Sequence, residues 1–115
     1  MFCCFLSAEN VDLPGCNNEG WLSLREFGND SVTCRHDRFQ EVTWTISHPD
    51  NNAPIFSGSC PTLGAPCRTY SDIILTRKKE SSDLTIVANY RKYGNTIVTC
   101  KAGSAYSCHI RIVRE

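Results

Sequence analysis

Cysteine and histidine are the residue types in this chain whose spacing could support chemistry. The sequence contains eight cysteines and three histidines. The histidines, His36, His48 and His109, are scattered, and no Cys-x-x-Cys pair occurs, so the spacing does not predict a zinc site. The motifs Gly-x-Ser-x-Gly and His-Glu-x-x-His and a phosphate-binding glycine-rich loop are absent from the sequence. We therefore expect no catalytic residue, no bound metal and no cofactor.

Eight cysteines in so short a chain favour a disulfide framework instead. The count is even and well above average usage, which is typical of small proteins in an oxidising compartment and predicts a secreted protein. The alternative is a cytosolic protein with eight free thiols. The cysteines are Cys3, Cys4, Cys16, Cys34, Cys60, Cys67, Cys100 and Cys108.

Short segments of alternating apolar and polar residues position two of these cysteines. Cys34 lies in Ser-Val-Thr-Cys-Arg-His and Cys100 ends Thr-Ile-Val-Thr-Cys, while Trp44 lies in Val-Thr-Trp-Thr-Ile and Leu84 begins Leu-Thr-Ile-Val. A period of two places alternate side chains on a core face, as in a half-buried strand. Cys34 and Cys100 share the inward phase, so a bond between them requires two strands that face each other in two packed sheets.

This pattern resembles an immunoglobulin-like domain, with its inter-sheet disulfide and the tryptophan that packs on it. The resemblance covers roughly residues 20–113 and implies an all-β, disulfide-rich sandwich of two antiparallel sheets with seven or eight strands. Two features depart from the family. Val98 stands two residues before the second core cysteine, where the family commonly has tyrosine, and the usual Asp-x-Gly of the preceding turn is absent. Some other contact must therefore fix the turn over residues 88–95.

The length of the chain fits one domain over residues 1–115. Residues 1–20 are rich in Asn, Gly and Pro, so we expect an irregular segment tied down by disulfides, followed by the sandwich over residues 21–113. Residues 48–66 are expected to be connection rather than core. The predicted strands cover residues 21–25, 31–36, 41–47, 72–76, 83–88, 95–100 and 106–113.

The remaining cysteines resemble those in the immunoglobulin-like domains of invertebrate secreted immune lectins, notably molluscan fibrinogen-related proteins. The features that carry this resemblance are a second pair, Cys60 with Cys67, and Cys108 in the last strand. It implies that Cys108 bonds to a cysteine of the first segment, because that segment runs beside the last strand in such domains. Vicinal Cys3 and Cys4 rarely bond each other, so one would join Cys108 and the other Cys16. An intermolecular bond is the alternative.

Charge and hydropathy exclude two classes of partner. Twelve Lys and Arg balance twelve Asp and Glu, which disfavours a nucleic-acid binder because such domains normally carry a basic excess. No apolar run approaches the roughly 20 residues of a membrane-spanning helix. We therefore expect neither nucleic-acid binding nor insertion into a membrane.

The resemblance implies that three turns gather at one end of the sandwich, where basic and aromatic residues form a candidate face for an acidic or glycan partner. The competing interpretation of Arg77-Lys78-Lys79 is a solvated turn. A loop closed by Cys60 and Cys67 is a further candidate, because a braced loop loses less entropy on binding. The sequence Asn29-Asp-Ser matches the N-glycosylation pattern. The candidate contact residues are Arg38, Phe39, Arg77, Lys78, Lys79, Lys101 and Tyr106.

The leading interpretation is an extracellular recognition module of the innate-immune or adhesion type, which contacts a protein or glycan through its loops. Its neighbours could be other domains of a longer chain or the other subunits of a disulfide-linked oligomer. One alternative is a stand-alone secreted effector, such as a venom component or soluble inhibitor. Another is a structural or dimerisation domain of a multidomain lectin.

Overall fold

The computed structural model describes residues 10–13, 21–51, 53–61 and 67–113 of the 115 residues. Within these ranges the regular structure is β-strand, apart from one short 3-10 helix. The prediction of an all-β chain is confirmed. The elements are β1 (Asn10–Leu13), β2 (Trp21–Arg25), β3 (Ser31–Arg35), β4 (Val42–Ser47), β5 (Pro54–Cys60), β6 (Ile73–Arg77), β7 (Ser81–Ile86), η1 (Tyr90–Tyr93), β8 (Thr96–Ala102) and β9 (Ser104–Val113).

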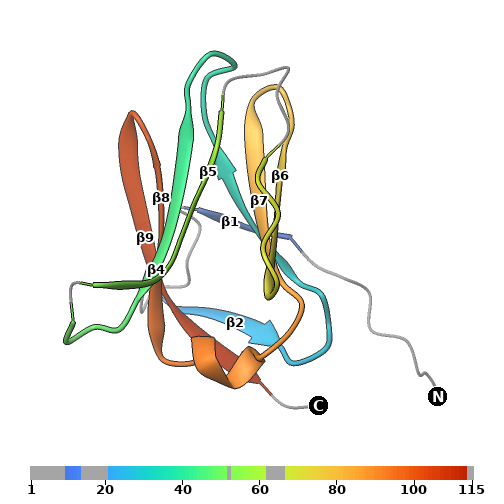
Figure 1. The fold of residues 1–115 in the computed structure, drawn as a ribbon, viewed down its shortest axis with the longest axis vertical. Helices are drawn as coiled ribbons and strands as arrows, with labels where there is room; N and C mark the ends of the chain where they lie inside the picture. The colour runs from blue at the N-terminus through green and yellow to red at the C-terminus, as the bar shows by residue number, and fades with distance from the viewer. Residues whose placement is uncertain (1–9, 14–20, 52, 62–66, 114–115) are drawn as a thin grey trace.

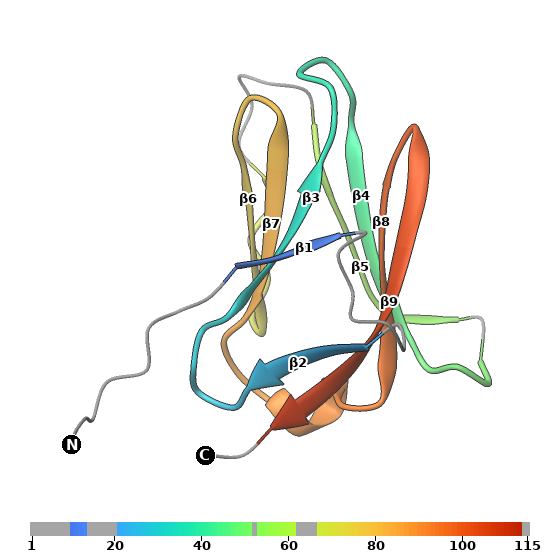
Figure 2. The same cartoon turned by 180° about the vertical axis from the view of Figure 1, so that it is seen from behind.

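The strands form two sheets that pack face to face. One sheet has the order β1-β3-β7-β6 and the other has the order β2-β9-β8-β4-β5. The chain changes sheet at each step from β1 to β4, and again between β5 and β6 and between β7 and β8. Figures 1 and 2 show the two layers from opposite sides. Strands that follow one another in the sequence therefore often face each other across one core, as in a β-sandwich.

The core contains the residues that the alternating segments place inward. In β4, Val42, Trp44 and Ile46 are fully buried and alternate with half-buried polar residues. Cys34 of β3 and Cys100 of β8 form the predicted disulfide between the sheets. Trp44 lies directly opposite Cys100 in the register of β4 and β8, so both side chains occupy the inward face beside that bond.

The strand order and the buried tryptophan beside the inter-sheet disulfide define an immunoglobulin-like β-sandwich. Leu84 of β7 is fully buried, as predicted. Val98 is also fully buried, at the position where the family commonly has tyrosine. The predicted fold class is therefore confirmed, including the departure at Val98.

Strand β5 corrects the prediction that residues 48–66 are only connection. Phe56, Gly58 and Cys60 are buried and alternate with exposed Ser57 and Ser59, and β5 pairs with β4. Proline, glycine and serine are poor strand formers, so the local sequence indicated a loop. An edge strand tolerates them, because only one of its sides must pair with a neighbour.

The N-terminal edges of both sheets also differ from expectation. Strand β1 lies parallel to β3 and β2 lies parallel to β9, so each sheet is mixed rather than wholly antiparallel. The prediction of an irregular segment over residues 1–20 is wrong for residues 10–13; the disulfides predicted to tie this segment lie outside the described residues. With β1 and β5, the described ranges hold nine strands instead of seven or eight. Four residues give little local signal, and the open edge of β3 supplies their partner.

A tyrosine on η1 fixes the turn whose usual tyrosine is missing. Tyr93 is buried, and its hydroxyl donates a hydrogen bond to the Asp72 carboxylate at 2.9 Å. Asn89 donates to the other carboxylate oxygen of Asp72 at 2.9 Å, and the Thr96 hydroxyl donates to the Tyr93 carbonyl at 2.5 Å. The Tyr93 hydrogen bond is the main cause that lowers the pKa of Asp72, while burial raises the pKa of Tyr93. The turn over residues 88–95 is thus tied to the start of β6.

Candidate functional site

Three turns meet at one end of the sandwich, as the resemblance implied. The guanidinium of Arg77, at the end of β6, donates hydrogen bonds to three backbone carbonyls of the β3–β4 loop. The acceptors are Gln40, Arg38 at 2.8 Å and Asp37 at 3.5 Å. The β8–β9 turn lies against the same loop, because a Cβ at Gly103 would come 2.5 Å from the side-chain nitrogen of Gln40. Figure 1 shows the three turns at the upper end of the view; we call this surface the loop end.

The β3–β4 loop presents an aromatic ring at the loop end. Phe39 is 77% exposed, and the guanidinium carbon of Arg38 lies 5.8 Å from the centre of its ring. The loop is closed by two hydrogen bonds between Asp37 and Gln40, at 3.0 and 3.3 Å. Because Arg77 braces the same segment, the loop is ordered before any partner binds, and ordering it adds little to the entropic cost of association.

Arg77 has a different role from the predicted one. It was expected to contact a partner, but its side chain is half-buried and turned onto the β3–β4 loop. A guanidinium has five donors in a planar fork, so it can bind several carbonyls at once. Lys78 and Lys79 remain exposed, and Lys78 lies 4.0 Å from the carboxylate of Asp83 in β7. These two lysines thus have the arrangement expected of a solvated turn.

Tyr106 is also misplaced by the prediction. It lies opposite Cys100 in the register of β8 and β9, so it shares the inward face and packs against the core. The period of two along β9, counted back from buried Cys108, would have indicated this. Lys101 lies on the other phase and is exposed, opposite Thr43 on the outer face of the sheet.

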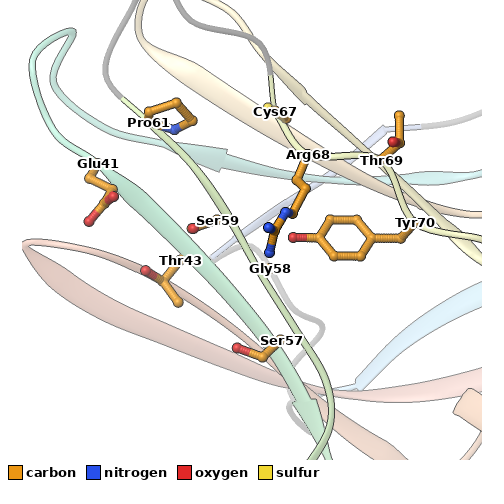
Figure 3. Close-up of a pocket in the computed structure, with 10 residues that line it drawn as sticks. All are labelled: Glu41, Thr43, Ser57, Gly58, Ser59, Pro61, Cys67, Arg68, Thr69 and Tyr70. Carbon is orange, nitrogen blue, oxygen red and sulfur yellow. The ribbon is translucent and has the colours of Figure 1, made fainter.

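A polar pocket of about 750 Å³ lies beside edge strand β5 and was not predicted. One wall is β5 with its neighbour β4, and the other is the segment that returns toward β6 (Figure 3). We call it the β5 pocket. No single motif could have revealed it, because its residues come from three segments that only the fold brings together. They are Glu41, Thr43, Ser57, Gly58, Ser59, Pro61, Cys67, Arg68, Thr69 and Tyr70.

The two walls of the β5 pocket are held together at both ends. Cys60 and Cys67 form the predicted second disulfide, with their Cα atoms 4.4 Å apart. Further along, the ring of Tyr70 packs edge-on against Phe56, with 4.9 Å between ring centres. A Cβ at Gly58 would lie 2.8 Å from the Tyr70 hydroxyl, so glycine is what allows this close approach. The pocket is therefore preformed.

The opposite end of the molecule exposes a second phenylalanine. Phe27, in the turn between β2 and β3, is 76% exposed and packs on the ring of Tyr90 with 5.0 Å between centres. Tyr90 and Tyr93 are buried, so they stabilise the fold instead of offering rings for stacking on sugars. Asn29 of the candidate glycosylation sequence is exposed in the same turn.

Three further findings on the described residues concern metal ligands, membrane spans and Cys108. Within them, no group of three or more His, Cys, Asp or Glu side chains is placed to hold a metal ion. None of the helices in those ranges is long and apolar enough to cross a membrane. Cys108 takes part in a disulfide. Its predicted partners, Cys3, Cys4 and Cys16, lie outside the described residues.

Comparisons with known proteins do not assign this chain to a family. No protein-family model matches the sequence, and no curated protein matches it. A similar solved structure is that of the extracellular domains of the voltage-gated sodium channel β4 subunit, described as parallel homodimers that explain its role in cell–cell adhesion. The match has a TM-score of 0.44 and 9% identity, and covers 84% of this chain and 93% of that one. The immunoglobulin-like assignment rests on this chain's own strand order and disulfide, and the narrower resemblance to molluscan lectins has no support.

Proposed function

We propose that this chain is an extracellular recognition module that binds a protein partner through the loop end. The observation that carries the proposal is Phe39, an aromatic ring left in solvent at the tip of a loop that the rest of the fold holds rigid. A ring in this position gains most of its hydrophobic stabilisation only when a partner covers it. Aromatic residues and arginine are the types most enriched at the centres of protein interfaces.

The size of the expected effect follows from the exposed area of Phe39. Burying a phenylalanine side chain stabilises by roughly 1.5–3 kcal/mol, which corresponds to roughly a tenfold to hundredfold gain in affinity. Arg38 stacks beside the ring and adds a charge that can pair with an acidic group. The loop end also has exposed lysines outside the β3–β4 loop, namely Lys78, Lys79 and Lys101. Their charges would affect the rate of association with a partner more than the final affinity.

The cysteines support an extracellular location for this activity. The described residues include the Cys34–Cys100 and Cys60–Cys67 disulfides, and Cys108 is also disulfide-bonded. Such bonds persist in oxidising compartments and are reduced in the cytosol. Intact mass measured before and after reduction checks this point, and a native protein with freely alkylatable thiols would contradict it.

The two exposed phenylalanines provide a matched experiment. The oxidised protein is made as a tetramer and screened against an array of extracellular domains, and each hit is measured by surface plasmon resonance. Phe39→Ala is expected to lower affinity at least about tenfold. Phe27→Ala removes an equally exposed ring at the far end and is expected to leave affinity unchanged. Equal effects of the two substitutions, or full binding by Phe39→Ala, would refute recognition through the loop end.

A further inference from the structure

The β5 pocket offers hydroxyl groups that have no hydrogen-bond partner among the described residues. Thr43 and Ser59 lie opposite each other on β4 and β5, and Ser57 follows on the same outer face. Thr69 and Tyr70 line the second wall, and Figure 3 shows the Tyr70 hydroxyl directed toward β5. None of these five side chains hydrogen-bonds to another residue in the described ranges. Each hydroxyl can donate one hydrogen bond and accept others, so the pocket can match a ligand that does both.

Two opposite charges complete the pocket. Glu41 and Arg68 both line it and are both exposed. Among the described residues neither forms an ion pair, with each other or with a third group. In Figure 3 they come from opposite walls, with Ser59 between them. The carboxylate only accepts hydrogen bonds and the guanidinium only donates them. The pocket therefore has no net charge but has a strong acceptor and a strong donor facing a common space.

We propose that the β5 pocket binds an uncharged saccharide. Adjacent sugar hydroxyls can donate to the Glu41 carboxylate, while sugar oxygens can accept from the Arg68 guanidinium. The remaining sugar hydroxyls match Thr43, Ser57 and Ser59, which both donate and accept. An ionic ligand would be attracted by one of these two groups and repelled by the other, so the pocket gains little from a net charge on the ligand and a neutral ligand loses nothing by comparison.

The frame of the pocket suits a weakly interacting ligand of this kind. A sugar gives up many hydrogen bonds to water when it binds, so only a site that is already ordered can bind it with a useful net gain. The Cys60–Cys67 disulfide and the Phe56–Tyr70 contact provide that order. The volume of about 750 Å³ lies within the range of about 300–1,000 Å³ found for small-molecule sites. Apart from Glu41, the last residue of the β3–β4 loop, the residues of this site lie outside the loop end, and the proposal goes beyond the function proposed above.

The test is a titration of the oxidised, ¹⁵N-labelled protein, followed through its amide NMR signals. The probes are the methyl glycosides of glucose, galactose, mannose and N-acetylglucosamine. We expect at least one of them to shift amides of residues 57–60 and 67–70 with a dissociation constant in the millimolar range, about that of a site with few charged hydrogen bonds. Arg68→Ala and Glu41→Gln should each weaken binding about tenfold or more.

Matched variants separate this proposal from general effects on charge or folding. Arg91→Ala and Glu80→Gln make the same chemical changes at other exposed positions and should leave sugar binding unchanged. Phe39→Ala should also leave sugar binding unchanged. A negative result for partner binding at the loop end therefore does not refute sugar binding in the β5 pocket, and the reverse also holds. The proposal is overturned if no glycoside shifts these amides. It is also overturned if the shifts lie elsewhere or if the pocket variants bind normally. N-acetylneuraminic acid and short peptides are titrated as comparison ligands, and binding of these alone would overturn the proposal as well.

Discussion

The brace formed by Arg77 makes a prediction about stability and loop order that can be tested without knowing any partner. Replacing Arg77 with methionine keeps the length of the side chain but removes the hydrogen bonds to the β3–β4 loop. The bond to the Gln40 carbonyl is partly buried, whereas the 2.8 Å bond to the Arg38 carbonyl is exposed. The contact with the Asp37 carbonyl, at 3.5 Å, is at the limit of a hydrogen bond.

The expected magnitude follows from these three contacts. A hydrogen bond from a charged donor contributes roughly 1.5–3 kcal/mol when it is shielded from water, and much less in solvent. We therefore count the bond to Gln40 near the lower end of that range, add little for Arg38 and nothing for Asp37. The free energy of unfolding should fall by about 1–2 kcal/mol, and the melting temperature by roughly 4–8 °C for a domain of this size. Arg77→Lys should recover only part of the loss, because an ammonium group cannot reproduce the planar fork.

Urea unfolding followed by tryptophan fluorescence measures the stability, and amide hydrogen exchange of residues 37–40 measures the order of the loop. Lys79→Met is the control, since it removes a neighbouring exposed charge that makes no contact with the loop in the described residues, and it should change stability by less than about 0.5 kcal/mol. If Arg77→Met and Lys79→Met behaved alike, with unchanged exchange in the loop, Arg77 would be an ordinary surface cation and the explanation of the loop end would be wrong.

Two further predictions concern other parts of the fold. The Tyr93 hydrogen bond lowers the pKa of Asp72 in the folded state, so the stabilisation from this carboxylate is complete above the ordinary aspartate value of about 3.9 and is lost as pH falls through the folded-state pKa. The difference in urea midpoint between the protein and its Asp72→Asn variant should accordingly shrink between pH 5 and pH 2; a constant difference would show that the ionised form is not favoured by folding. We also propose that Asn29 carries an N-linked glycan after passage through a eukaryotic secretory pathway, and an intact mass equal to that of the bare polypeptide would contradict this.

The part of the fold that could be predicted from the sequence is the part encoded by alternation within single strands. The alternation of apolar and polar residues along β4 is enough to predict that Val42, Trp44 and Ile46 point inward. The shared inward phase of Cys34 and Cys100 made a bond between two facing sheets possible, and the resemblance to an immunoglobulin-like domain implied that bond. A period of two is a local property, since a sheet with one buried face imposes it on each strand separately.

The loop end was predicted in outline and only partly in detail. Its position followed from the order of the strands, and Phe39 was correctly placed on the surface. The hydrogen bonds of Arg77 to the β3–β4 loop could not be predicted, because a long side chain at a strand end can turn toward solvent or toward a neighbouring loop. The direction that the side chain takes depends on the backbone carbonyls of Asp37, Arg38 and Gln40, which are distant from Arg77 in the sequence.

The sequence by itself therefore determined the fold class, the core disulfide and the inward residues, because these depend on patterns within a few consecutive residues. The tertiary structure alone decided which distant segments contact one another. It showed that Pro54–Cys60 is a strand, that Tyr93 replaces the missing tyrosine contact, and that Glu41 and Arg68 share one pocket. The physical reason is that these contacts are made between segments that are distant in the sequence. Only the packing of the two sheets brings those segments together.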